Sequence, residues 1–341
     1  MTGTDHGSHD LVLTQDAAVN QEKIERLLAA EPGGTVRLPA GTYPLARGIV
    51  LGSGWTLAGA EPGDGSVTTW LTSATPDGQP IVQVLGSQVV VERLGFRPPP
   101  CSPGEHGGDR GTAITIGSYL YPAEAQWIEG IQVRQVQVER RDTRAANCIA
   151  VVGAVRDVAI SDVSIAGGCT GVAVHWGAVG AGVDSIVGPS YHPHHLTISD
   201  LRVSDAFEGF YLSSVHDVEV DRVRLSDVEI GFRLLPGDNT DRFHSSAGNQ
   251  VGQRIRVSDA WVSWNGPLYA VRIAGWGRSE IDHAIRVLEY RDVLVEECTL
   301  VPLPLAGSGS ADPLRPRSPV VIEQAPGVVL DRIRIDSRQR G

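Results

Sequence analysis

A tyrosine and two arginines stand at the same position of a short segment that recurs along the chain. The segment has the pattern Gly-apolar-any-apolar, and its variable position is occupied by Tyr211 in one copy and by Arg233 in another. Arg272 occupies the same position in a close variant of the segment. His175 lies two positions further along a corresponding segment. If such segments are strands stacked about 4.8 Å apart, the four side chains meet on one surface.

These residue types suit proton abstraction from a uronate sugar. Such a reaction needs a positive group that neutralises the carboxylate, a base that removes the α-proton and an acid that protonates the leaving oxygen. Arg233 and Arg272 are planar, bidentate donors for the carboxylate. His175 is the base best matched to neutral pH, and Tyr211 is a proton donor. We therefore expect these four residues to be catalytic in a lyase, or in an epimerase if the proton returns to the other face.

An eight-residue pattern determines where these segments lie. The pattern is apolar-any-apolar, two linking residues and apolar-any-apolar, and its alternation gives each octet one buried and one solvent-facing side. Each octet predicts two short strands joined by a tight bend. The eight octets begin at Val89, Ile131, Val158, Leu196, Val218, Ile255, Val293 and Val328.

A third strand follows most octets, so that three strands form one coil of a solenoid. The shortest interval between octets, 22 residues from Leu196 to Val218, is about what one such coil needs. The expected fold is all-β, a right-handed parallel β-helix with three strands per coil. An antiparallel β-sandwich would also contain many short alternating strands, but it does not predict a fixed octet.

Insertions collect at one place in the repeat, after the third strand and before the next octet. They occupy residues 176–195, 236–252 and 274–291. Loops gathered on one edge of a solenoid are typical of a binding site. In or beside them we expect the substrate-binding residues Trp176, Ser213, Asp238, Asp241, Trp276, Arg278, Glu280 and Asp282.

A short amphipathic helix is expected over residues 15–31, with Ala18, Ile24, Leu27 and Leu28 on its apolar side. The sequence G-G-T-V-R-L-P-A-G-T-Y follows from residue 33. This combination resembles the start of many proteins of the pectate-lyase-like β-helix superfamily, in which the helix covers the open end of the solenoid. The resemblance implies that fold, and a carbohydrate ligand for most members, but no single reaction.

Glycoside hydrolysis is an alternative reaction on this fold. Polygalacturonases of the superfamily carry N-T-D, D-D, G-H-G and R-I-K segments on neighbouring coils, and of these only an N-T-D occurs here, at residues 239–241. Hydrolysis requires two carboxylates that flank the scissile bond. They would have to come from Asp238, Asp241, Glu280 or Asp282.

Three further functions agree with the same sequence. Residues 275–277, Gly-Trp-Gly, look similar to a segment of β-helix fructotransferases. A cofactor-free intracellular isomerase or cyclase of a natural product would use the same acid-base residues. A non-catalytic carbohydrate-binding solenoid would instead depend on aromatic stacking without a titrating set of residues.

The sequence predicts no cofactor, because it contains no P-loop and no G-x-G-x-x-G that opens a helix. Residues 191–195, Tyr-His-Pro-His-His, are histidine-rich, but Pro193 interrupts them and no second Cys/His set completes a metal site. Calcium would need clustered oxygens, which the loop acids allow but do not require. The cysteines show no C-x-x-C spacing and are expected to be buried free thiols: Cys101, Cys148, Cys169 and Cys298.

The net charge of −11 argues against nucleic acid as a partner. The first ten residues are polar and resemble neither a signal peptide nor a membrane span. A cytoplasmic protein is therefore expected, or a secreted one whose leader was removed. The expected organisation is a polar segment over 1–14, one β-helix domain over 15–337 and a tail over 338–341. The expected partner is a carbohydrate or small molecule, and the solenoid could also form dimers or trimers.

Overall fold

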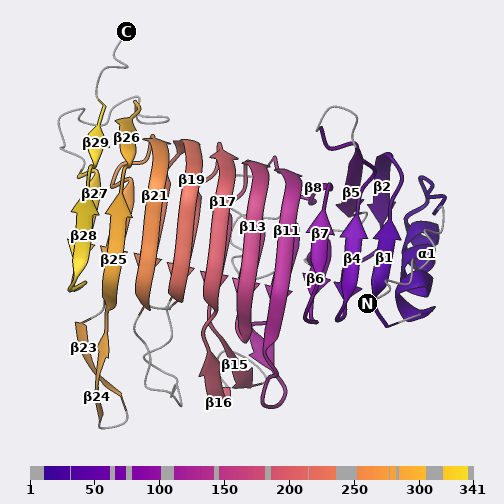
Figure 1. Cartoon of the computed structure of the whole chain (residues 1–341), viewed down its shortest axis with the longest axis horizontal. Helices are drawn as coiled ribbons and strands as arrows, with labels where there is room; N and C mark the ends of the chain where they lie inside the picture. Colours follow the sequence, from indigo (N-terminus) through magenta and orange to yellow (C-terminus); the bar gives the residue numbers. More distant parts are fainter. Residues whose placement is uncertain are drawn as a thin grey trace, which may run out of the picture.

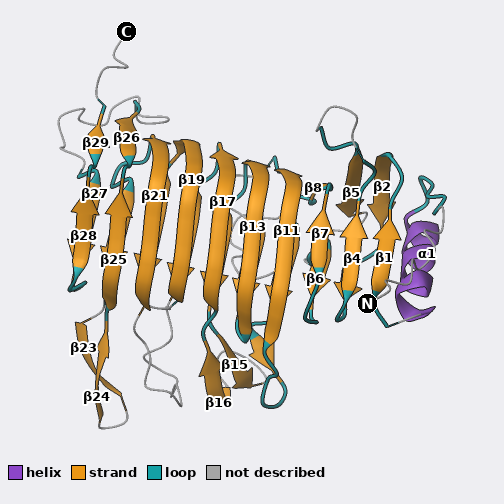
Figure 2. Ribbon diagram, in the orientation of Figure 1, coloured by secondary structure: helices purple, strands orange, loops and turns teal. Residues whose placement is uncertain are grey.

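The protein is a right-handed parallel β-helix, as the sequence predicts, with one α-helix at its N-terminal end (Figures 1 and 2). A computed structural model gives this fold for most of the chain. The described residues are 11–30, 32–61, 66–73, 79–100, 111–141, 146–180, 186–213, 215–235, 252–275, 277–281, 284–304 and 318–336.

The octets stack in register in one large sheet, which we call the octet sheet. Ile131 pairs with Val158, Val158 with Leu196, Leu196 with Val218, and Val218 with Ile255. Five octets lie in single long strands: β11 (Ile128–Glu139), β13 (Val155–Ala166), β17 (His194–Ser204), β19 (His216–Val228) and β21 (Gly252–Trp264). The others are split into two strands: β7 (Val90–Glu92) and β8 (Gly95–Arg97), β25 (Tyr290–Glu296) and β26 (Thr299–Pro302), and β28 (Val328–Asp331) and β29 (Arg334–Ile335).

The third strands form a second parallel sheet, which we call the third-strand sheet. The apolar core lies between the two sheets, and the stacked rings of Phe210 and Phe232, 4.9 Å apart and at most 1% exposed, belong to it. The strands are β3 (Ile49–Leu51), β6 (Val82–Val84), β9 (Ile114–Gly117), β12 (Ile149–Val152), β14 (Thr170–His175), β18 (Glu208–Ser213), β20 (Ile230–Leu235), β22 (Val271–Ala274) and β27 (Val320–Glu323).

Two coils precede the first octet found in the sequence. Their octet-sheet strands are β1 (Gly34–Arg37), β2 (Gly41–Leu45), β4 (Trp55–Ala58) and β5 (Thr69–Ser73), and β3 and β6 complete them. The octet pattern does not match these coils, because the link between their two half-octets is longer than two residues. In the second coil it runs from Ala58 to Thr69.

The helix α1 (Ala17–Ala30) covers the N-terminal end of the solenoid (Figure 1). The Asp16 carboxylate caps it by accepting hydrogen bonds from the backbone amides of Ala18 and Val19 at 2.9 and 3.1 Å. Ile24 is fully buried, but the placement of Ala18 on the buried side was wrong, because Ala18 is exposed. Asn20 is buried instead and donates a hydrogen bond to the carbonyl of Pro44 at 3.0 Å. A polar side chain of α1 thus pairs with a backbone carbonyl at the edge of the first coil. No helix in the described ranges is long and apolar enough to span a membrane.

Two of the three insertions contain additional strands at one edge of the solenoid (Figure 1). In the first, β15 (Gly177–Gly180) pairs with β10 (Leu120–Tyr121) and with β16 (Ile186–Tyr191). In the third, β23 (Gly277–Ile281) and β24 (Ala284–Leu288) form an antiparallel pair. The second insertion, apart from Gly252, lies outside the described residues.

The cysteines that the structure describes are free thiols, as expected from their spacing. Cys148 and Cys298 are buried and Cys169 is half-buried. Burial raises the pKa of the Cys298 thiol to about 11, so this cysteine stays protonated at neutral pH. Cys101 lies outside the described residues.

The bend within each octet is made by one residue in the left-handed backbone region. Gln135, Asp162, Asp200 and Asp259 all have φ between 47° and 54° at this point. Asp and Asn tolerate this region better than other residues with a Cβ, and Gly tolerates it best. The frequent Asp at the bend, visible in the sequence, thus reflects a backbone requirement.

We expect opposite effects of the same substitutions at two exposed glutamines of β11. At Gln135, with φ 54°, Gly should stabilise the fold and Val should destabilise it by about 1–2 kcal/mol, because a β-branched residue is strained in the left-handed region. At Gln132, in the extended part of the strand, Gly should cost about 0.5–1 kcal/mol and Val should be tolerated. Urea unfolding of the four variants tests this, and equal effects at the two positions would refute the assignment of the bend.

Candidate active site

Tyr211, Arg233 and Arg272 lie side by side on the third-strand sheet, as predicted. Tyr211 pairs with Arg233, and Arg233 with Arg272, on the neighbouring strands β18, β20 and β22. The preceding positions of the same row are Ala173, Ala150 and Thr115, which also agrees with the sequence. The intervening core residues are buried, so this row projects from the outer face.

Arg233 is fixed by a buried carboxylate, Glu208, that no pattern in the sequence predicts. Its Nη2 donates to Oε1 of Glu208 at 2.8 Å, and its Nε lies 2.8 Å from Oε2. Glu208 is 1% exposed, whereas the Arg233 side chain is 29% exposed. The Thr170 hydroxyl also donates to Oε1 of Glu208 at 2.8 Å. One edge of the guanidinium is therefore anchored while part of the group still reaches the surface.

The charge of Arg233 is stabilised where it lies. Burial alone lowers the pKa of a guanidinium, but the charge and hydrogen bonds of Glu208 outweigh that effect and raise the pKa of Arg233. The guanidinium carbon also lies 4.3 Å from the centre of the Tyr211 ring, in a cation–π contact. Arg233 and Tyr211 thus form one packed unit.

Arg272 has a similar anchor on its other side. Its Nη2 donates to Oε2 of Glu323 at 2.9 Å, and the guanidinium carbon is 5.7 Å from the Tyr269 ring centre. Burial opposes the charge, but hydrogen bonds to Tyr269 and Glu323 raise the pKa of Arg272. Across four adjacent strands the charges therefore read carboxylate, guanidinium, guanidinium, carboxylate.

His175 lies beside Tyr211 on the same outer face. The two ring centres are 6.1 Å apart, and the Tyr119 ring is 5.4 Å from His175 on another side. Nδ1 of His175 is 2.9 Å from the carbonyl oxygen of Trp176. A carbonyl only accepts, so Nδ1 carries the proton in the neutral ring and Nε2 carries the lone pair. This tautomer presents Nε2 as the basic atom.

Two predicted substrate-binding residues are buried next to this cluster. Ser213 is fully buried and Trp176 is 5% exposed. Tyr211, Leu235 and Ala274 form a small apolar cluster of their own on this side. In the conformation described, both residues contribute to the wall of the site more than to its open surface.

The side chains of the other six predicted site residues lie outside the described part of the structure. Arg278 and Glu280 lie on β23, of which the structure describes the backbone only. The remaining four lie outside the described residues: Asp238, Asp241, Trp276 and Asp282.

The signals for the missed residues differ. Glu323 follows Ala274 in the row that contains His175, so extending that row by one coil would have found it. Glu208 stands at the corner where β18 begins, three residues before Tyr211. Strict alternation does not hold at corners, so the sequence carried no signal for its contact with Arg233.

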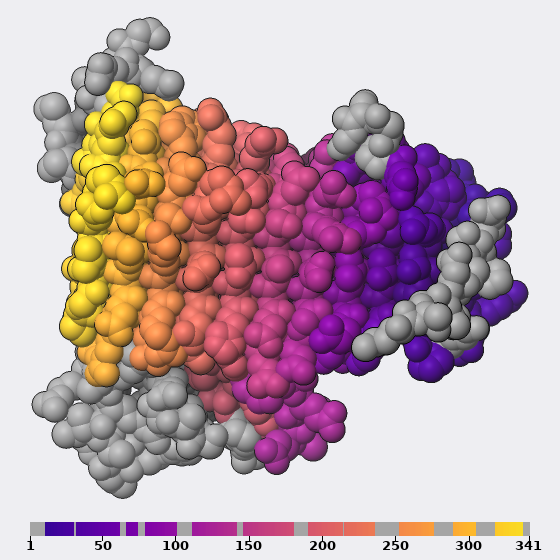
Figure 3. Space-filling model, in the orientation of Figure 1, coloured from indigo at the N-terminus to yellow at the C-terminus, as the bar shows by residue number. Residues whose placement is uncertain are grey.

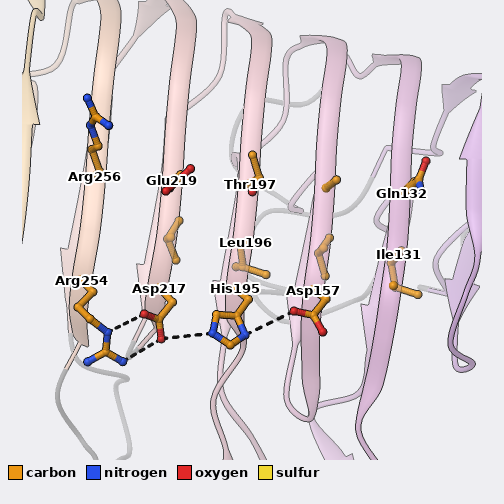
Figure 4. Close-up of a pocket in the computed structure, with 14 residues that line it drawn as sticks. Ile131, Gln132, Asp157, His195, Leu196, Thr197, Asp217, Glu219, Arg254 and Arg256 are labelled. Atoms are coloured by element: carbon orange, nitrogen blue, oxygen red, sulfur yellow. Dashed lines mark hydrogen bonds and ion pairs between the residues drawn. The ribbon is translucent and has the colours of Figure 1, made fainter.

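A second polar cluster lies on the octet sheet, at the residues that precede four octets. Asp157, His195, Asp217 and Arg254 all have φ near 55° and line a surface concavity of about 610 Å³ (Figure 4). His195 lies between the two carboxylates, 3.4 Å from Asp157 and 3.9 Å from Asp217. Arg254 donates to both oxygens of Asp217 at 2.6 and 2.8 Å. We call these four residues the histidine–aspartate row.

Two more histidines pack against this row. His216 Nδ1 is 2.7 Å from Asp217, and the His194 and His216 rings are stacked 4.7 Å apart. The hydrogen bond from Arg254, followed by that from His216, holds the pKa of Asp217 well below its usual range. The acids and bases here are paired with one another, so we regard the row as a structural charge network. Within the described residues no group of three His, Cys, Asp or Glu side chains could hold a metal ion.

No protein-family model matches this sequence, and no curated protein matches it. Solved structures do. The endo-xylogalacturonan hydrolase from Aspergillus tubingensis is similar with a TM-score of 0.53 and 13% identity over 96% of this chain and 92% of that chain. The chain has the pectin-lyase-like β-helix fold. PfbA, a surface adhesin of Streptococcus pneumoniae, is equally similar, with a TM-score of 0.53 and 11% identity over 97% and 90% of the two chains.

A third structure, ORF18 of Geobacillus virus E2, is similar with a TM-score of 0.49 and 12% identity. The match covers 95% of this chain and 60% of that one, so the chain spans less than two thirds of that relative. Identities at this level show a shared fold and not a shared activity.

Loss of the Glu208 carboxylate should destabilise the fold far more than loss of an exposed one. Glu208→Ala leaves the half-buried Arg233 without its partner, and we expect a loss of about 3 kcal/mol. Glu139→Ala breaks the exposed pair with Arg97, 2.8 Å apart, and should cost less than about 1 kcal/mol. Urea unfolding measures both, and similar losses would show that the buried pair is not a stabilising contact.

Stability should fall as the pH drops below neutrality, partly because of His194. Burial is the main cause that lowers the pKa of His194, with His216, His195 and Arg156 adding to it. A histidine whose folded pKa is lowered takes up its proton first in the unfolded state, so the folded state loses stability below about pH 6.5. His194→Gln should reduce this loss in urea unfolding between pH 7.5 and about pH 5.5. An unchanged pH dependence in the variant would contradict the assignment.

Proposed function

We propose that the protein is a carbohydrate-active lyase that acts on a uronate-type oligosaccharide or a related acidic metabolite. The observation that carries the proposal is the convergence of His175, Tyr211 and Arg233 on one face of the third-strand sheet, with Arg272 beside them. The shared fold with an endo-xylogalacturonan hydrolase supports a carbohydrate ligand by analogy only.

The two arginines would bind the substrate carboxylate. They are register partners on adjacent strands, which lie about 4.8 Å apart. Their protein carboxylates, Glu208 and Glu323, lie on the strands outside the pair. A substrate carboxylate placed between the guanidinium groups would meet positive charge from both sides. Neutralising that carboxylate acidifies the neighbouring α-proton and stabilises the charge that develops as the proton leaves.

His175 would remove the α-proton and Tyr211 would protonate the leaving oxygen. The C–H electron pair becomes the new C=C bond, the β-carbon–oxygen bond breaks, and the oxygen takes the tyrosine proton. Nε2 of His175 is the atom with the lone pair, since Nδ1 faces the carbonyl of Trp176. No water is consumed in this step, and the products together have the mass of the substrate.

The relative position of base and acid supports elimination over epimerisation. Epimerisation returns a proton to the face of the sugar opposite the one from which it was taken. Ring centres about 4.5–7 Å apart are already in contact, and those of His175 and Tyr211 are 6.1 Å apart on one sheet face. A sugar ring does not fit between them, so both groups would approach it from the same side.

A non-catalytic carbohydrate-binding protein is the second candidate. It is favoured by the equal similarity to PfbA, a surface adhesin, and by the low exposure of Tyr211, at 8%. Such a protein would bind the same oligosaccharides through Arg233 and Arg272 without converting them.

The test is a screen of the purified protein against uronate oligosaccharides, neutral oligosaccharides and fructans. We expect a rise in absorbance from unsaturated uronate ends, with product masses that contain no added water. His175→Ala and Tyr211→Phe should each lower kcat by about 10²–10⁴-fold while substrate binding, measured by calorimetry, is retained. His195→Ala, a histidine of the opposite sheet, should leave turnover unchanged.

Products that contain one added water would replace the lyase with a hydrolase. Binding of a uronate oligosaccharide without any conversion would favour the binding protein. Neither binding nor conversion of any sugar would refute the proposed carbohydrate function.

A further inference from the structure

The last coil leaves core positions of the solenoid uncovered. Ile322, Leu330 and Ile335 are 42%, 39% and 54% exposed. They pair in register with residues of the preceding coil that are at most 3% exposed: Ile273, Val295 and Leu300. The exposed residues are therefore inward-facing side chains that no further coil covers within the described residues.

The backbone of this coil is open as well. Among the described strands, β27, β28 and β29 each pair with one neighbour only, so no other described strand pairs with the N–H and C=O groups of their outer edges. In Figure 1 these strands form one end of the molecule, while α1 covers the other. An exposed strand edge next to apolar core residues is a template for association. We call the outer surface of β27, β28 and β29 the open end.

We propose that the open end is a dimer interface at which two copies of this chain meet end to end about a two-fold axis. The other end of the solenoid is covered by α1, so head-to-tail stacking of copies is blocked. An interface of one surface with itself is the closed alternative, and it gives a dimer and not a filament.

The apolar pattern of the last octet fits this symmetry. Its inward positions, Val328, Leu330, Ile333 and Ile335, are the first, third, sixth and eighth residues of V-V-L-D-R-I-R-I. Reversing the direction of the octet leaves this pattern unchanged. In an antiparallel pair Val328 would face Ile335 of the partner subunit, and Leu330 would face Ile333 of the partner subunit. Apolar side chains thus meet apolar side chains along the whole octet.

The charges of the octet fit the same arrangement. The reversed register sets Asp331 opposite Arg332 of the partner subunit. Within one chain these two side chains form an ion pair at 2.9 Å and are 45% and 58% exposed, so the dimer would extend this pair across the axis. Arg332, with φ 49°, forms the bend of this coil. A two-fold axis through the bend exchanges the two arms of the coil, so the corners of both copies coincide. The pairing therefore keeps both the coil shape and the charge complementarity.

The experiment is sedimentation of the full chain over a range of concentrations. We expect a species of twice the 36.3 kDa of one chain. Ile322→Glu should give a monomer, because it places a charge in the dimer interface. Val50→Glu, at an exposed apolar residue of β3, should leave the dimer intact. Thermal unfolding followed by circular dichroism establishes that both variants are folded.

A charge exchange tests the register itself. Asp331→Arg should weaken the dimer because it opposes two arginines across the axis, and adding Arg332→Asp should restore it. A wild-type monomer at high concentration, a trimer or filament, or a dimer that survives both Ile322→Glu and Asp331→Arg would overturn the proposal. A double variant that stays monomeric while folded would overturn the register.

Discussion

Parallel hydrogen bonding between coils, in register, is the constraint on which the rest of the structure depends. Each coil repeats the path of the one before it, so residues at equivalent positions form rows along the solenoid, visible as lines of side chains in Figure 3. A slip of one residue would exchange the buried and outward faces of every strand. Tyr211, Arg233 and Arg272 are neighbours only because Phe210, Phe232 and Val271 occupy successive core positions.

The fold could be predicted because this register appears in the sequence as apolar residues that alternate with a period of two. The octets and the third strands are recognisable by this alternation. Residues at equivalent positions of successive coils then form the rows. The first two coils could not be found in this way, since an insertion separates their half-octets. Ala18 was misplaced because hydrophobicity alone assigned the buried side of α1, whereas the open backbone of the first coil selects the polar Asn20. Contacts made at corners, such as that of Glu208 with Arg233, lie outside any periodic rule.

The charged side chains also lie either in rows along the solenoid or at the corners between strands. On the third-strand sheet a row places two guanidinium groups side by side, and the corner residue Glu208 holds one of them. On the octet sheet the left-handed positions before the octets carry acids and bases in turn, and these neutralise one another. The first arrangement places two guanidinium groups next to each other, whereas the second alternates each base with a carboxylate. This difference is the physical reason for placing the chemistry on the third-strand sheet.

The helix that covers the N-terminal coil also bears on how the chain acquires its structure during synthesis. Each coil contacts mainly its neighbours, and the N-terminal part of a chain emerges from the ribosome first. The first coils can therefore stack, with the cap in place, before the last coils have been synthesised. Every subsequent coil then finds a finished edge with the correct register already set. In this sense α1 fixes the end from which the nascent solenoid grows.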